Sequence, residues 1–154
     1  MNNKFIVVSD SHGLIEPLNK VYDLHKNDIE VFFHCGDAEV PIEYLNNYIC
    51  VNGNNGYDPQ LNNEIIYKFN NYNILLIHGH KQLMYGLEYL AQYAKEKECN
   101  IVLFGHTHIF THTIIDGITL INPGSLNYNR DHSKPSYCIV DTSNNTISVN
   151  KLYI

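Results

Sequence analysis

The stretch VLFGHTHIF, residues 102–110, runs from an apolar strand-like segment into a glycine and two histidines. A buried strand gains nothing from a polar pair at its end, so His106 and His108 require another explanation. Neutral imidazole is the commonest metal ligand among side chains. A metal ion is therefore the first hypothesis, and it predicts that other strands of this chain also end in metal-ligating residues.

The overall composition fits one globular domain that spans residues 1–154. The chain has 44% hydrophobic residues, a net charge of −6 and a pI near 5.8. An acidic surface of this kind offers no basic field for duplex nucleic acid or an anionic membrane. No apolar run approaches the ~20 residues that span a bilayer, and the N-terminus lacks the long apolar region of a signal peptide. We therefore expect a cytoplasmic protein without a membrane partner.

The four cysteines are widely separated and form no CxxC pair. Three of them lie in or beside apolar runs, where a free cysteine behaves as a small hydrophobic residue. We expect reduced core thiols rather than a disulfide framework.

Apolar and polar periodicity predicts the order of the secondary-structure elements. Strands are expected at residues 4–9, 30–34, 48–54, 64–70, 73–78 and 100–105, with shorter strands within 110–121 and 136–153. Helices are expected at 16–26 and 83–97, with a short helix at 41–47 that begins at Pro41. The first half is thus βαβαβ and the second half is mostly β with one strong helix. This order suggests two packed sheets with helices outside them.

Polar residues recur at the carboxyl ends of five of these strands. They are Asp10 and His12, Asp37, Asn54, His78, and His106 with His108. In open α/β sheets, ligands bind outside the carboxyl ends of the strands. Residues i and i+2 of an extended chain point the same way, so each Asp-x-His or His-x-His pair is expected to aim both side chains at one place.

This donor set has the chemistry of a divalent metal site. It contains two carboxylates, one amide oxygen and four imidazoles, and no sulfur. Such donors favour Mn²⁺, Fe²⁺ or Zn²⁺ over a cysteine-type structural zinc. Seven ligands are too many for one transition metal, but they suit two ions that share a carboxylate, roughly 3.5–4 Å apart.

Six short motifs give the chain a recognisable resemblance. They are DSHG (10–13), GD (36–37), GN (53–54), HGH (78–80), GHTH (105–108) and NPGS (122–125). In this order they resemble the calcineurin-like metallophosphoesterase superfamily, and in particular its small prokaryotic phosphodiesterases of the YfcE/MJ0936 type. The resemblance covers essentially the whole chain. It implies an α/β fold, a four-layer α/β/β/α sandwich of two mixed sheets.

The resemblance also implies a dinuclear centre and a reaction. One ion would be bound by Asp10, His12, Asp37 and His108, and the other by Asp37, Asn54, His78 and His106, so that Asp37 bridges them. Mn²⁺ is the first choice, with Fe, Ni, Co or Zn as alternatives. The implied activity is hydrolysis of a small phosphate ester or cyclic nucleotide by a metal-bridging hydroxide, in a possible homodimer.

One position departs from the superfamily pattern. The third motif usually continues into a histidine that is thought to protonate the leaving oxygen, whereas this chain has Asn55. His80, which follows the expected ligand His78 by two residues, could replace it as a catalytic group or could only support the ligands. Arg130, the only arginine, could contact the phosphate or lie idle on the surface. The NPGS segment is expected to be a rigid turn that braces the site.

The alternative function is a protein-interaction scaffold. A relative in the eukaryotic retromer coat uses this fold mainly in that way, and by resemblance its ligand set is incomplete. All seven ligand positions are filled in this chain, which favours an enzyme. The remaining histidines are expected to be structural or surface residues: His25, His34, His112 and His132.

Overall fold

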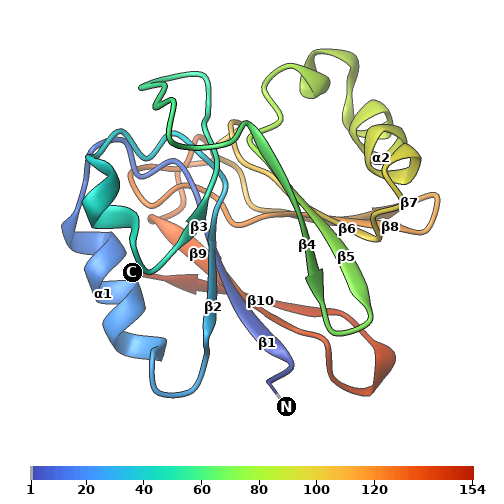
Figure 1. Cartoon of the computed structure of the whole chain (residues 1–154), viewed down its shortest axis with the longest axis horizontal. Helices are drawn as coiled ribbons and strands as arrows, with labels where there is room; N and C mark the ends of the chain where they lie inside the picture. Colours follow the sequence, from blue (N-terminus) through green and yellow to red (C-terminus); the bar gives the residue numbers. More distant parts are fainter. Residues whose placement is uncertain (1) are drawn as a thin grey trace.

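The computed structural model describes residues 2–154, which form two five-stranded mixed sheets (Figure 1). The first sheet has the order β10-β9-β1-β2-β3, with β1 Lys4–Val8, β2 Val31–His34, β3 Ile49–Cys50, β9 Ser136–Asp141 and β10 Ser148–Tyr153. The second has the order β4-β5-β6-β8-β7, with β4 Glu64–Phe69, β5 Tyr72–Ile77, β6 Ile101–Leu103, β7 Thr111–Ile115 and β8 Ile118–Asn122. The helical segments are α1 Glu16–His25, η1 Ile42–Leu45, η2 Gln82–Tyr85, α2 Leu87–Glu96 and η3 Ser143–Asn145.

The alternation of side chains along β1 explains why this strand is apolar at almost every position. Phe5 and Val7 face the second sheet and pack in one core with residues such as Ile74 and Leu103. Ile6 and the other outward-facing residues of β1 pack in a separate core that includes α1. Because successive side chains of a strand point to opposite faces, a strand buried on both sides needs apolar residues throughout.

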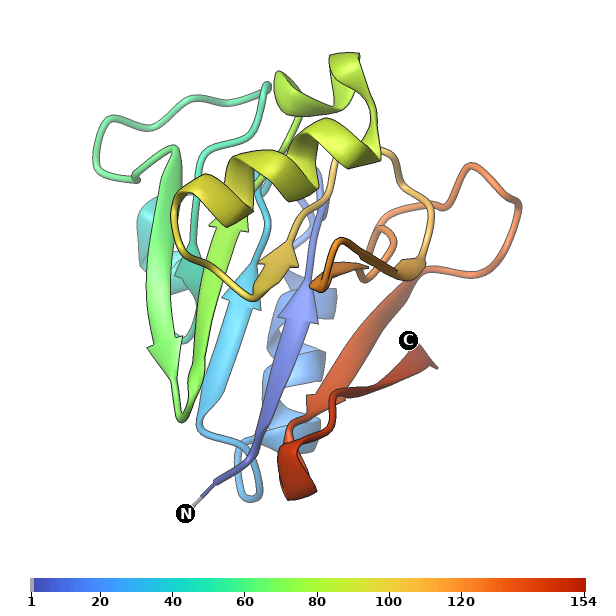
Figure 2. The same ribbon diagram turned by 90° about the vertical axis from the view of Figure 1, so that its right-hand side faces the viewer.

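The second sheet is covered on its outer face in the same way. Leu90 and Ala94 of α2 pack against Leu75 of β5 and Val102 of β6. The layers are therefore α1, first sheet, second sheet and α2, as Figures 1 and 2 show from two directions. The four-layer α/β/β/α sandwich implied by the sequence is confirmed.

Three predicted elements differ from the observed ones, each for a local reason. The helix expected at 83–97 is divided at Gly86, whose φ of 97° and ψ of 171° no other residue type tolerates well. Pro41 precedes a short 3₁₀ helix with ψ of 145° and is not its first helical residue. The strand expected at 48–54 pairs with β2 only at Ile49 and Cys50, and the chain then turns toward Asn62.

The parallel strands bring the relevant loops to one end of the molecule. β1, β2 and β3 are parallel neighbours, as are β5 and β6. Their carboxyl ends all lie at the upper end of Figure 1. Within residues 2–154, the helices are all too short or too polar to cross a bilayer.

His34 at the end of β2 has a structural role, as expected. The Gly36 N–H donates to its Nδ1 at 3.1 Å, so the ring proton lies on Nε2 and is donated to the Ser11 hydroxyl at 2.9 Å. Complete burial lowers the pKa of His34 to about 4, which keeps the ring neutral. The imidazole thereby joins the loop after β1 to the loop after β2. The four cysteines are buried free thiols, which confirms that expectation.

Candidate metal centre

The site is built from loops whose backbone is left-handed at several donor residues. Asp10, His12, Asp37, His106 and His108 all have φ between +45° and +72°. The expectation that Asp-x-His and His-x-His lie in extended chain is therefore wrong. Such conformations cost free energy and persist only where the surroundings hold them.

Hydrogen bonds between distant loops hold this backbone. The amides of Asp10 and His12 donate to the carbonyls of Gly36 and Asp37, both at 3.0 Å, which joins the loops after β1 and β2. The His106 N–H donates to Asp10 Oδ2 at 3.0 Å and so attaches the loop after β6. The donors from both sheets are thus fixed relative to one another.

The NPGS segment braces these loops, as expected from the sequence. The Asn122 amide donates to the Gly105 carbonyl and to the Thr107 hydroxyl, both at 3.0 Å. The Ser125 hydroxyl donates to the Asp10 carbonyl at 2.7 Å.

Two histidines have a tautomer fixed by a backbone carbonyl. His78 Nδ1 donates to the Cys35 carbonyl at 2.8 Å, and His108 Nδ1 donates to the Tyr128 carbonyl at 3.1 Å. A carbonyl only accepts, so the proton of each neutral ring lies on Nδ1 and the Nε2 lone pair faces the cluster. This is the arrangement that metal-ligating histidines adopt.

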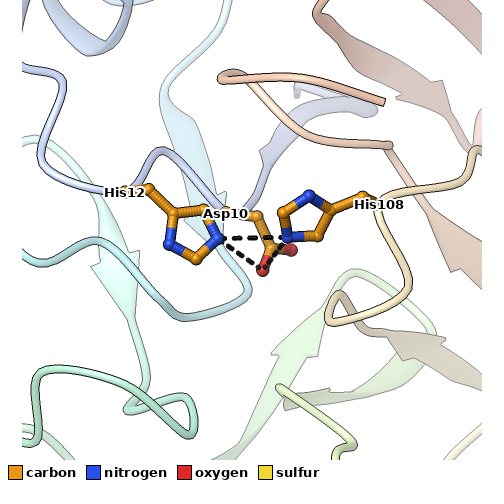
Figure 3. A group of neighbouring side chains, drawn as sticks. All are labelled: Asp10, His12 and His108. Carbon is orange, nitrogen blue, oxygen red and sulfur yellow. Dashed lines mark hydrogen bonds and ion pairs between the residues drawn. The ribbon is translucent and has the colours of Figure 1, made fainter. Parts of the chain in front are cut away.

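The first group of donors consists of Asp10, His12 and His108 (Figure 3). His108 Nε2 lies 3.2 Å from Asp10 Oδ1 and 3.1 Å from His12 Nε2, while His12 Nε2 lies 3.7 Å from Asp10 Oδ1. Asp10 Oδ1 is buried and has no hydrogen-bond partner. An unpaired carboxylate oxygen beside two inward-facing imidazole nitrogens fits a cation.

The second group lies on the other side of Asp37. Asp37 Oδ2 is 3.4 Å from His78 Nε2 and 3.9 Å from His12 Nε2, so this carboxylate lies between the two groups. Asn54 Oδ1 is 2.9 Å from His78 Nε2 and 3.1 Å from His106 Nδ1. The structure thus brings all seven expected donors together, in an arrangement consistent with a dinuclear centre.

The ionisation of the site shows how strongly it attracts positive charge. Burial acts to raise the pKa of Asp10, but hydrogen bonds with His108 and His12 hold that pKa well below its usual range. Burial also acts to raise the pKa of Asp37, but hydrogen bonding to His78 and to Asn55 lowers it to about 2. The hydrogen bond to Asp10 outweighs burial and raises the pKa of His12 to about 9. A metal ion must therefore displace a proton, which makes metal affinity rise with pH.

Two supporting residues were not identified from the sequence. Glu39 accepts a hydrogen bond from His12 Nδ1 at 2.5 Å, and Asn55 donates its backbone and side-chain N–H groups to the two oxygens of Asp37, both at 2.9 Å. Metal-ligating histidines commonly donate to a carboxylate, so an acid two residues after Asp37 was an available signal. Asn55 was considered only as a missing proton donor.

His80 and Arg130 lie at the edge of the donors. The ring of His80 is centred 5.5 Å from that of His78 and 6.1 Å from that of His106, and its buried Nδ1 has no partner. Arg130 is exposed and lines a cavity of about 350 Å³ together with His12, Asp37 and Tyr128. Both side chains therefore border the cleft above the donors.

Comparison with known proteins shows the family. The model of the calcineurin-like phosphoesterase superfamily domain matches residues 4–145, and the chain belongs to this superfamily. It is 31% identical to the probable metallophosphoesterase YsnB of Bacillus subtilis, covering 94% of this chain and 87% of that protein. The crystal structure of a predicted phosphoesterase from Streptococcus pneumoniae matches with a TM-score of 0.91 and 26% identity, over 98% of this chain and 89% of that one.

A vacuolar sorting protein shares the fold alone. The Vps29 structure from Entamoeba histolytica matches with a TM-score of 0.75 and 22% identity, over 98% of this chain and 99% of that one. The same sandwich therefore occurs outside the phosphoesterases. The function of this chain has to be argued from its site.

Replacing Glu39 tests the supporting contact to His12. We expect Glu39→Ala to weaken binding of one Mn²⁺ roughly 10–100-fold, because supporting partners of metal-ligating histidines have effects of this size. Glu43→Ala, at an exposed acid on η1, is the control and should bind Mn²⁺ like the parent. Competition with a fluorescent chelator measures both affinities. Equal affinities in the two variants would contradict a role for Glu39.

Proposed function

We propose that this chain is a dinuclear metal-dependent phosphodiesterase or phosphatase that hydrolyses small phosphate esters. The observation that carries the proposal is the convergence of seven donors around the unpartnered Asp10 Oδ1. Membership of the phosphoesterase superfamily supports the reaction class. The residue roles below belong to this proposal.

The donors divide between two ions that share Asp37. Asp10, His12 and His108 complete one coordination sphere with Asp37, and Asn54, His78 and His106 complete the other. The oxygen and nitrogen donors suit Mn²⁺ first, with Fe, Ni, Co or Zn as alternatives. When bound, such ions lower the pKa of a coordinated water and stabilise negative charge on phosphoryl oxygens.

The protein's own side chains supply orientation and charge around the substrate. Asn55 fixes both oxygens of Asp37, so the shared carboxylate keeps one orientation. Arg130 lines the cleft with its guanidinium exposed and contacts a phosphoryl oxygen of the substrate. His80, beside the second group of donors, faces the ester oxygen that leaves.

The substrate is a small phosphate ester or cyclic nucleotide, and the protein acts in the cytoplasm. A scaffold function, as considered from the sequence, would place no demand on the donor residues. The fixed tautomers of His78 and His108 and the complete donor set favour catalysis instead.

Hydrolysis of bis-p-nitrophenyl phosphate tests the proposed function. We expect Mn²⁺-loaded protein to release p-nitrophenolate, EDTA to abolish the activity, and added Mn²⁺ to restore it. Asp37→Ala should remove the activity and lower the bound metal, while Asp131→Ala, at an exposed acid away from the donors, should change neither. Mn²⁺-loaded protein that hydrolyses neither this diester nor p-nitrophenyl phosphate would contradict the proposal.

A leaving-group series tests the consequence of Asn55. Burial and the neighbouring histidines lower the pKa of His80, so its acid form is scarce near pH 7. General acid catalysis contributes roughly 10²–10⁴-fold, and poor leaving groups need it most. We therefore expect activity to fall steeply as the pKa of the leaving alcohol rises, and Asn55→His to restore turnover of alkyl esters.

The matched measurement separates Asn55 from His80. Asn55→His should change p-nitrophenyl ester hydrolysis little, because p-nitrophenolate leaves without a proton. A shallow dependence in the parent protein that becomes steep in His80→Ala would refute the missing acid and assign the role to His80.

A further inference from the structure

A second cavity of about 540 Å³ opens beside the metal centre. It shares Asn54, His78 and His80 with the site described above, so the two cavities are continuous through these residues. An ester whose phosphate lies at the donors can therefore extend its organic group into this space. We call it the side cavity, lined in addition by Tyr57, Asn63, Glu64, Lys81, Gln82 and Tyr93.

Two tyrosines give the side cavity aromatic walls. Tyr57 lies on the loop after β3 with 69% of its surface exposed, and Tyr93 lies on α2. Figure 1 shows this loop and the η2–α2 segment rising from the same end of the molecule. The hydroxyl of Tyr93 donates to Glu64, which holds that ring in place. Tyr57 has no such constraint and leaves its ring free to stack on a ligand.

The charges around the side cavity balance. Glu64 pairs with Lys97, whose Nζ lies 3.2 Å from its carboxylate and 4.8 Å from the centre of the Tyr93 ring. Lys81 is the cation among the lining residues, against the carboxylate of Glu64. The amides of Asn63 and Gln82 supply both donors and acceptors. These walls suit a neutral group with hydrogen-bonding edges better than a second phosphate.

We infer that the side cavity binds the organic group of the ester and that this group is a nucleoside with an aromatic base. The inference rests on the proposed function, because the phosphate must lie at the metal centre. Bases stack on aromatic side chains regardless of their identity, and polar side chains then read their edges. A saturated chain would use neither the tyrosine rings nor the amides. Tyr57 is thus a specificity-determining residue.

Inhibition constants measure the contribution of the side cavity. Adenosine 5′-monophosphate and methyl phosphate share the phosphate and differ in the organic group. With Mn²⁺-loaded protein and bis-p-nitrophenyl phosphate as substrate, we expect adenosine 5′-monophosphate to inhibit at least about tenfold more tightly, as expected for one stacked base.

Variants of Tyr57 assign that difference to the cavity. Tyr57→Ala should bring the ratio of the two inhibition constants close to one, and Tyr57→Phe should keep it, because the ring remains. Tyr85→Ala is the control, since Tyr85 is 71% exposed and lies outside the lining of the side cavity. A parent ratio near one, or a ratio unchanged by Tyr57→Ala, would overturn the inference.

A titration without metal separates this inference from the proposed function. Adenosine added to metal-free, isotope-labelled protein should shift NMR signals of Tyr57, Asn63 and Gln82 and leave those of α1 unchanged. If the loaded protein hydrolyses no ester, the proposed function fails while this titration still decides whether the cavity takes a nucleoside. Absence of shifts at these residues would overturn the inference even in an active enzyme.

Discussion

Buried acceptors that face one another with no donor between them are the constraint on which this structure depends. Asp10 Oδ1 has no partner, and the Nε2 atoms of His12 and His108 lie 3.1 Å apart beside it. Leaving one buried polar atom unsatisfied costs about 1–3 kcal/mol, and more if it is charged. A cation removes this cost at once. Without a metal, the raised pKa of His12 shows that a proton serves the same need.

The fold can maintain this arrangement because each sheet provides part of it. The loops of the first sheet contribute Asp10, His12, Asp37 and Asn54, and those of the second contribute His78, His106 and His108. The core between the sheets fixes the distance between the two sets. Close approach is also needed: a Cβ at Gly53 would lie 2.0 Å from Asp37 Oδ1, and one at Gly105 would lie 2.1 Å from Ser9 Oγ. Packing of the sheets and assembly of the donors are therefore one event.

The sequence predicted the elements and the donors better than the geometry that joins them. Apolar periodicity is local, so it located β1 and α2 and the polar residues that follow the strands. The left-handed backbone at Asp10, Asp37 and His108 arises from hydrogen bonds between distant loops, which periodicity does not record. The same holds for Glu39, whose role depends on its contact with His12 rather than on a motif of its own.

Crystallography of the Mn²⁺-loaded protein, with anomalous diffraction at the manganese edge, tests the central claim most directly. The account predicts two anomalous peaks roughly 3.5–4 Å apart, as in two-metal sites generally, with the Asp37 carboxylate between them. His108 should contact one peak, and His78 the other. A single peak at full metal occupancy, or peaks that the Asp37 carboxylate does not touch, would contradict the account.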